Sequence, residues 1–303
     1  MYDVIIVGAG TAGLSAAIYT VRAGKSALIL EAASYGGQII NTPDIENYPG
    51  IAHISGFDFA TGLYNQAKDL GAEIKFERVT GIETSADGKI VKTSQGEYQC
   101  KAVILATGAK NRPLGLPEEQ ELIGKGISYC ATCDGMFYRG KVVAVNGGGN
   151  TALEDAQFLS NYCSKVYLIH RRDQFRADNK EVERLKAKDN VEFVLNSNIT
   201  KLNSDDTGLI SLDVTDKNTG GVRTIEVSGL FVAIGQAPDN TAFDNVAKLD
   251  PKGYIEAGED LKTGSDGIFT AGDCRTKTVR QLTTAASDGA VAALAACGYI
   301  DSL

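Results

Sequence analysis

The chain has 303 residues, enough for about two domains that each bury a hydrophobic core. An apolar fraction of 43% and a charged fraction of 22% are ordinary for a water-soluble globular protein. The formal net charge of −8 argues against a nucleic-acid partner and against binding to an anionic membrane surface.

The first 31 residues predict a dinucleotide-binding unit. An apolar strand at 2–7 leads into Gly8-Ala9-Gly10-Thr11-Ala12-Gly13, then a helix to about residue 22, a strand at 26–30 and Glu31. Gly8, Gly10 and Gly13 let the backbone turn tightly and approach a pyrophosphate, whose charge the helix N-terminus stabilises. Glu31 can accept hydrogen bonds from ribose hydroxyls. No charged-then-apolar leader precedes this strand, so we expect no secretory signal.

A loop is expected at 34–56, where Gly36-Gly37-Gln38, Asn47 and Pro49-Gly50 interrupt any regular pattern. Such a long polar loop indicates a functional segment or, alternatively, a solvated connector. The spacing of apolar residues predicts a helix at 57–71, followed by short strands and a buried strand at 102–106 that ends in Thr107-Gly108.

The next feature is Cys130-Ala131-Thr132-Cys133-Asp134, and Cys130 and Cys133 are the only closely spaced pair among the six cysteines. A zinc site would need more Cys or His ligands, and the chain has no second close pair and only His53 and His170, so we expect no metal. Two core thiols at chance spacing remain an alternative. Asp134-Gly135 indicates the exposed start of a helix, which favours a redox pair with a lowered thiol pKa. Asp134 is then the natural proton donor and acceptor, or a helix cap.

The second half repeats the first. A strand at 142–145, the turn Gly147-Gly148-Gly149-Asn150-Thr151-Ala152, a helix at 153–159 and a strand at 166–169 are followed by meander-like strands. A strand at 230–234 ending in Gly235 echoes the one at 102–106. The sequence therefore predicts an α/β fold with two Rossmann-like domains, each a three-layer unit with a parallel sheet, and with β-meander insertions.

The residues after the second strand of each module indicate which dinucleotide that module binds. Glu31 suits a free ribose 2′-hydroxyl, whereas His170-Arg171-Arg172, with Arg176 one turn later, suits a 2′-phosphate. Such a charge run can also be a solvated face. In this position it predicts NADP in the second module, with His170 lining the site.

The closing segment at 267–273 is a short strand into a glycine turn with Asp273, and 281–296 predicts a helix. The apolar-rich tail at 289–300 is too short to span a bilayer. We assign this tail to the first module. The expected domains are 1–112 with 244–303, and 113–243 carrying the cysteine pair.

Together these residues resemble the low-molecular-weight thioredoxin reductases of bacteria, over essentially the whole chain. The resemblance rests on the first glycine turn, Gly36-Gly37-Gln38, Glu46-Asn47-Tyr48-Pro49-Gly50, the cysteine motif through Gly135, the second glycine turn, His170-Arg171-Arg172, Phe175-Arg176-Ala177, Ala271-Gly272-Asp273 and Arg280-Gln281.

The resemblance implies FAD in the first module and NADPH in the second. The implied FAD residues are Gly8, Gly10, Gly13, Glu31, Gly37, Gln38, Asn47, Asp273, Arg280 and Gln281. The implied NADPH residues are Gly147, Gly149, Asn150, Thr151, Ala152, Arg171, Arg172 and Arg176. It further implies a homodimer that reduces thioredoxin, with Cys133 facing the flavin and Cys130 exchanging with the partner protein. The cytoplasm is expected on a separate ground, because the six cysteines form no disulfide framework and a reducing compartment is the default.

Three functions stay open on the sequence. The first is an NADPH-dependent thioredoxin reductase whose domains rotate about hinges near 111–115 and 238–243. The second keeps the fold with ferredoxin as donor or another small dithiol protein as acceptor, and the third is a flavoprotein sensor without turnover. Two residues depart from the family pattern: Thr11 replaces a proline, and Asn146 replaces an apolar residue before the second glycine turn.

Overall fold

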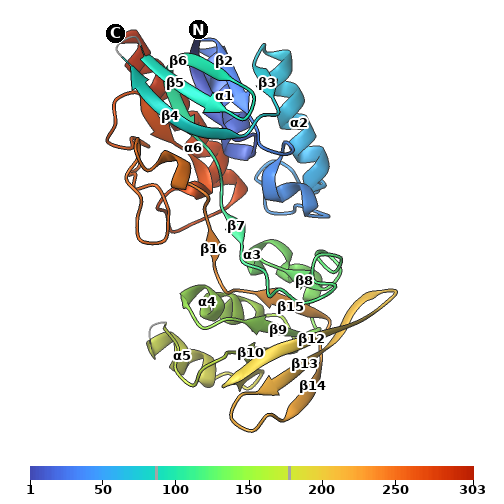
Figure 1. Ribbon diagram of the computed structural model, residues 1–303. Coiled ribbons are helices and arrows are strands. Elements are labelled where there is room, and N and C mark those ends of the chain that lie inside the picture. Colours follow the sequence, from blue (N-terminus) through green and yellow to red (C-terminus); the bar gives the residue numbers. More distant parts are fainter. Residues whose placement is uncertain (86–87, 177–178) are drawn as a thin grey trace. The chain divides into compact units, whose positions relative to one another are not determined.

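The computed structural model describes residues 1–85, 88–176 and 179–303, which divide into two compact units (Figure 1). The first unit comprises Met1–Lys110 and Ala237–Leu303, and the second comprises Asn111–Gln236. Ala177 of the family motif lies outside the described residues.

The second boundary between the units falls earlier than the expected residue 243 because Phe243 is buried in the first unit beside Ile5. Asn240 is also fixed there, by hydrogen bonds from its Nδ2 to the carbonyl oxygens of Gly253 (2.9 Å) and Cys274 (3.0 Å).

The first unit is built on a sheet whose described strands run in the order β3-β2-β1-β6-β5-β4, with β17 also paired to β6. Strands β1, β2, β3, β6 and β17 are mutually parallel, and β4, β5 and β6 form an antiparallel meander. The inner segments of β1, β2 and β6 are continuously apolar and buried because both faces of the sheet are covered there, whereas the edge strand β3 reads Glu-Ile-Lys. Their bounds are β1 Tyr2–Val7, β2 Ala27–Leu30, β3 Glu73–Lys75, β4 Val79–Ser85, β5 Gly88–Thr93, β6 Glu97–Leu105 and β17 Ile268–Thr270.

Helices α1 (Thr11–Arg22) and α6 (Leu282–Asp301) cover one face of this sheet, packing on Val4 and Ile6 (Figure 1). Ile5 and Val7 point to the other face, against a cluster that includes Phe243. Helix α2 (Gly56–Asp69) begins at Ser55, whose hydroxyl accepts the Asp58 N–H at 3.0 Å. The expected loop at 34–56 contains a short 3-10 helix, η1 (Gly37–Asn41), and α6 extends beyond the expected end at residue 296.

The second unit has a parallel sheet in the order β11-β10-β9-β15-β8 and a separate antiparallel meander, β12-β13-β14. The parallel strands are β8 Ile127–Ser128, β9 Val142–Asn146, β10 Lys165–Ile169, β11 Val191–Val194 and β15 Gly229–Val232; the meander strands are β12 Ser197–Asp205, β13 Gly208–Asp216 and β14 Val222–Glu226. The helical segments are α3 Ala131–Asp134, η2 Gly135–Tyr138, α4 Asn150–Leu159 and α5 Asn179–Lys186. The predicted α/β class with parallel sheets and β-meanders is therefore confirmed.

The chain passes between the units at β7 (Lys110–Asn111) and at β16 (Gln236–Ala237), which pair as a two-stranded sheet. Two further 3-10 turns, η3 (Thr241–Phe243) and η4 (Gly272–Cys274), lie in the returning segment. Within the described residues, no helix has the length and apolar character needed to cross a membrane.

Candidate active site

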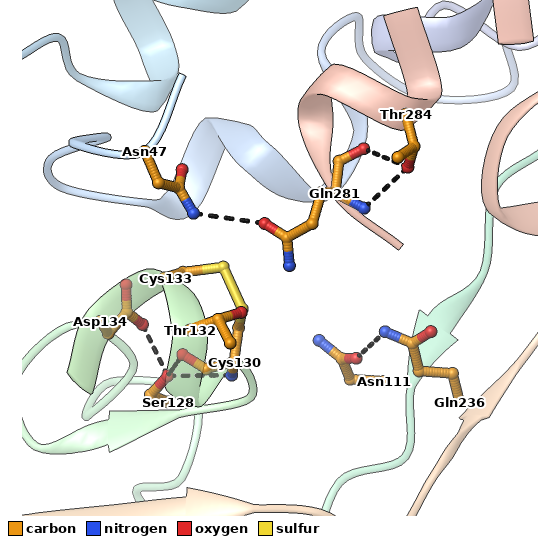
Figure 2. The surroundings of a disulfide bond; sticks show 10 residues. All are labelled: Asn47, Asn111, Ser128, Cys130, Thr132, Cys133, Asp134, Gln236, Gln281 and Thr284. Carbon is orange, nitrogen blue, oxygen red and sulfur yellow. Dashed lines mark hydrogen bonds between the residues drawn. A yellow bond between two sulfur atoms is a disulfide. The ribbon is translucent and has the colours of Figure 1, made fainter. Parts of the chain in front are cut away.

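Cys130 and Cys133 are joined by a disulfide at the start of α3, with their Cα atoms 5.3 Å apart (Figure 2). Both residues are half-buried, whereas the other four cysteines, Cys100, Cys163, Cys274 and Cys297, are buried and unpaired. The pair follows directly on β8, so it stands at the carboxyl end of a parallel strand, where ligands and reacting groups gather in open α/β sheets. The cysteine pair is thus a disulfide and not two isolated core thiols.

The carboxyl of Asp134 is held beside this disulfide by Ser128. The Ser128 hydroxyl donates to Asp134 Oδ2 at 2.6 Å and accepts the N–H of Cys130 at 3.0 Å (Figure 2). Burial raises the pKa of Asp134, and the hydrogen bond from Ser128 only partly opposes this. Asp134 Oδ1 is buried and has no hydrogen-bond partner among the described residues. The group is therefore suited to hold and release a proton near the sulfur atoms.

The alternative capping role of Asp134 is not found. Cys130 occupies the N-cap of α3, and neither Cys130 nor Asp134 makes a side-chain capping bond at the start of a helical segment. Sequence reasoning also missed Ser128. The sequence signal for it is a serine two residues before the first cysteine.

The first glycine turn lies between β1 and α1 and has the shape of a dinucleotide cradle. Gly8 has φ +110°, and a Cβ there would lie 2.4 Å from the Ala106 carbonyl oxygen; a Cβ on Gly13 would lie 1.9 Å from the Gly8 carbonyl oxygen. A Cβ on Gly10, by contrast, would meet nothing within 4 Å. Gly8 and Gly13 are needed for close packing, and Gly10 faces open space where a phosphate can approach.

The other residues expected around FAD are distributed along this turn and the returning tail. Glu31 accepts the N–H of Ala9 at 2.8 Å through Oε2 and that of Ala33 at 2.9 Å through Oε1, so it supports the glycine turn from within. Gly37 begins η1 at φ +66°, and the Gln38 amide donates to the Ala109 carbonyl.

Asn47 and Gln281, far apart in the sequence, are brought together in the first unit. Asn47 Nδ2 donates to Gln281 Oε1 at 3.2 Å, and Gln281 caps α6 together with Thr284 (Figure 2). Nearby in the sequence, Asp273 Oδ1 and Arg280 Nε are buried without hydrogen-bond partners in the described part of the chain. Burial raises the pKa of Asp273. These unpartnered polar atoms fit a site that a polar ligand completes.

The second glycine turn joins β9 to α4. A Cβ on Gly147 would lie 2.4 Å from the Ala233 carbonyl oxygen, and one on Gly148 would lie 2.0 Å from His170 Cε1, while Gly149 has open space around it. His170 is buried beneath the turn, where its Nε2 lies 3.1 Å from the Gln174 carbonyl oxygen, and burial lowers its pKa. His170 therefore supports the turn as a neutral ring. Asn150 and Thr151 begin α4 on its exposed side, and Ala152 is fully buried.

The three arginines expected around a 2′-phosphate are exposed, and they follow β10, the strand beside β9 in the sheet. The Arg176 N–H donates to the Gly148 carbonyl oxygen at 2.9 Å, which fixes the backbone after β10 against the glycine turn. Over residues 1–85, 88–176 and 179–303, none of the guanidinium groups of Arg171, Arg172 and Arg176 forms an ion pair with a carboxylate. All three are available to an anionic ligand.

His53, for which no task was predicted, lies on the loop after η1. Its Nδ1 is 3.0 Å from Asp44 Oδ2 and 3.4 Å from Glu46 Oε1, and the hydrogen bond with Asp44 raises the pKa of the ring. These three side chains are close enough to share a cation, but they are partly or largely exposed and already pair with one another. They stabilise the loop that carries Asn47.

The chain is similar to known proteins over its whole length. The family model described as pyridine nucleotide-disulphide oxidoreductase matches residues 2–289. The thioredoxin reductase of Bacillus subtilis is 39% identical over 100% of this chain and 96% of its own, and that of Treponema pallidum is 43% identical over 100% and 98%. The crystal structure of thioredoxin reductase from Streptococcus pyogenes superimposes with a TM-score of 0.96 at 39% identity, covering 100% of this chain and 99% of the other. The chain therefore belongs to the pyridine nucleotide-disulphide oxidoreductase family, and it is a disulfide oxidoreductase related to the thioredoxin reductases.

Proposed function

We propose that this protein is an NADPH-dependent thioredoxin reductase, with FAD in the first unit and NADPH in the second. The observation that carries the proposal is the Cys130–Cys133 disulfide with the buried Asp134 carboxyl beside it, in the unit that also has the arginine-flanked glycine turn. The net reaction converts NADPH, a proton and oxidised thioredoxin to NADP⁺ and reduced thioredoxin. We further propose a homodimer located in the cytoplasm.

The two glycine turns and the charged residues beside them assign one cofactor to each unit. Gly8, Gly10 and Gly13 would receive the FAD pyrophosphate, and Glu31, Gly37, Gln38, Asn47, Asp273, Arg280 and Gln281 would complete that site. Gly147, Gly149 and the start of α4 at Asn150, Thr151 and Ala152 would receive the NADPH pyrophosphate, with Arg171, Arg172 and Arg176 on the 2′-phosphate. Arginine favours NADPH over NADH there because its charge-assisted bonds to phosphate have no counterpart on a hydroxyl.

FAD held by the first unit would supply the disulfide with the two electrons that come from NADPH. The two electrons break the Cys130–Cys133 bond, and the sulfur atoms then need protons to become thiols. Asp134 holds a proton to a higher pH than an exposed aspartate, so it can deliver one to a sulfur atom and take it back. Ser128 keeps the carboxyl in place during this exchange.

The dithiol then reduces the partner protein by thiol–disulfide exchange. Cys130 attacks the disulfide of thioredoxin to form a mixed disulfide, and Cys133 displaces the partner's thiol while the Cys130–Cys133 bond re-forms. Because the cysteines and the NADPH turn belong to one unit and the FAD residues to the other, we propose that the units rotate during turnover. The hinges would lie where the chain crosses between the units, at Lys110–Asn111 and at Gln236–Ala237, because Asn240 and Phe243 of the expected hinge 238–243 are fixed in the first unit.

An anaerobic titration tests the proposal. NADPH should bleach the bound flavin at a far lower concentration than NADH, and adding oxidised thioredoxin should restore the colour. Bleaching by neither nucleotide would refute the donor and would favour a ferredoxin-fed enzyme. Bleaching by NADPH without return of colour on adding thioredoxin would point to another small dithiol protein as the acceptor.

A further inference from the structure

One buried carboxylate ties the glycine turn after β17 to helix α6. Asp288 Oδ2 accepts hydrogen bonds from the Gly272 N–H (2.9 Å), Arg275 Nε (2.9 Å) and Lys277 Nζ (2.9 Å), and Oδ1 accepts one from Arg275 Nη2 (3.0 Å). The side chains of Arg275, Lys277 and Asp288 are 5%, 6% and 10% exposed. Burial works to raise the pKa of Asp288, but the bonds from Arg275 and Lys277 outweigh it and the pKa is lowered. The carboxylate is therefore charged, and both of its oxygens accept hydrogen bonds.

The stretch that Asp288 holds contains two of the buried polar atoms that lack hydrogen-bond partners among the described residues, Asp273 Oδ1 and Arg280 Nε. Asp273 follows Gly272 directly, and Arg280 Nη2 donates to the Arg275 carbonyl oxygen at 3.4 Å. Asp273 Oδ1 and Arg280 Nε are buried and unpartnered within residues 1–85, 88–176 and 179–303. Asp288 holds the backbone before these two residues in place, at Gly272 through its N–H and at Arg275 through its side chain. The positions of Asp273 and Arg280 therefore depend on Asp288.

The fixed turn is also packed against the first glycine-turn helix. Gly272 has φ +80°, and a Cβ there would lie 2.8 Å from the Cβ of Ala12 in α1. Gly289, next to Asp288, brings α6 so close to α1 that a Cβ would lie 2.2 Å from the Ala12 carbonyl oxygen. The first glycine turn, the Gly272 turn and α6 therefore meet at one place, and the Asp288 side chain binds the last two together.

We propose that Asp288 is a positioning residue of the flavin site, which holds the Gly272 turn and Arg275 on α6 so that Asp273 and Arg280 are presented to the cofactor. The inference rests on the proposed assignment of FAD to the first unit. Without the carboxylate, the Gly272 N–H would lose its acceptor and the two buried cations, Arg275 and Lys277, would repel each other. The turn would then leave its place between α1 and α6.

The test uses the full-length protein stripped of flavin and compares Asp288→Asn with Asp301→Asn. Asp301 is the same residue type on the same helix, but its ion pair with Lys25 lies at the surface, where its side chain is 64% exposed. The dissociation constant for FAD is measured from the quenching of flavin fluorescence, well below the unfolding temperature of each apoprotein. We expect Asp288→Asn to weaken FAD binding by about tenfold or more and Asp301→Asn by less than about twofold.

A purely structural role would lower the unfolding temperature of Asp288→Asn but leave the dissociation constant of its folded apoprotein unchanged. That result would overturn the inference, as would an equal loss in Asp301→Asn. If Asp288→Asn does not fold, Arg275→Lys takes its place, because lysine keeps the charge and loses the two-bond contact; tight FAD binding by this variant would equally overturn the inference. Failure of the unmodified apoprotein to bind FAD would overturn the flavin assignment itself.

Discussion

The substitution Asp134→Asn separates the chemistry of the disulfide from the stability of the fold. Asparagine has the size of aspartate and can accept the hydrogen bond that Ser128 donates at 2.6 Å, but it cannot carry a proton to or from sulfur. The unfolding free energy should therefore change by no more than about 1–2 kcal/mol, the scale of one buried hydrogen bond. The rate of disulfide reduction should fall by about 10²–10⁴-fold, the usual contribution of a positioned acid or base. That loss corresponds to about 3–5 kcal/mol of barrier.

The direction of the pH effect follows from the raised pKa. The pKa of Asp134 in the folded protein lies above its ordinary value of 3.8, the value expected in the unfolded chain. The protonated carboxyl therefore contributes stability that is fully present below pH 3.8 and is lost as pH rises through the folded pKa. The asparagine side chain of the variant does not titrate. The stability of Asp134→Asn relative to the unmodified protein should therefore improve as the pH rises.

The assay is anaerobic stopped-flow of the flavin colour on adding oxidised thioredoxin to the NADPH-reduced enzyme, with urea unfolding at several pH values alongside. Ser128→Ala is the matched control, because it removes the hydrogen bond to the carboxyl but leaves the proton carrier, and it should slow turnover far less than Asp134→Asn. A variant Asp134→Asn that turns over at the unmodified rate near neutral pH would refute the assignment of Asp134 as the proton carrier.

Three further predictions concern the second unit. Replacing Arg171 and Arg176 by alanine should lower the ratio of kcat/KM for NADPH to that for NADH by about tenfold or more per arginine, since each loses a charge-assisted bond; an unchanged ratio would place the 2′-phosphate elsewhere. Gly148→Ala puts a Cβ 2.0 Å from the His170 ring and should weaken NADPH binding, measured by calorimetry, by about tenfold; unchanged binding would show that the ring can move freely. Burial raises the pKa of Asp155 from 3.8 to about 7, so the unmodified protein loses stability as pH rises from 3.8 to about 7. The stability of Asp155→Asn in urea relative to the unmodified protein should improve over that range, by up to about 4 kcal/mol before solvent screening reduces it; a difference independent of pH would contradict the raised pKa.

The sequence predicted best the parts that depend on local pattern. The strand at Tyr2–Val7, the glycine turn and the helix α1 were expected nearly residue by residue, because an apolar strand, three glycines and a helical stripe each have a short-range cause. The repeat of this pattern at β9 and α4 predicted the second unit in the same way. The close spacing of Cys130 and Cys133, with Asp134-Gly135 after them, favoured a redox pair over two core thiols at chance spacing, and the structure shows the disulfide.

What the sequence could not provide depends on contacts made in three dimensions. Helix α5 was not expected, since the polar segment Asn179–Lys186 buries little beyond Val182 and Leu185. The buried strand expected at 102–106 begins earlier in the structure, as β6 (Glu97–Leu105), because the outer half of β6 is only partly covered and lacks a continuous apolar pattern. Asp288 carried no motif, and its role is visible only when Gly272, Arg275 and Lys277 are seen around it.

The most direct test of the account is where reducing equivalents from NADPH appear in the protein. The enzyme is incubated anaerobically with NADPH, treated with a thiol-alkylating reagent under native conditions, and analysed as peptides by mass spectrometry. We predict alkylation at Cys130 and Cys133 only after exposure to NADPH, with the buried Cys100, Cys163, Cys274 and Cys297 unlabelled throughout. A Cys130–Cys133 disulfide that stays intact while NADPH bleaches the flavin would contradict the account.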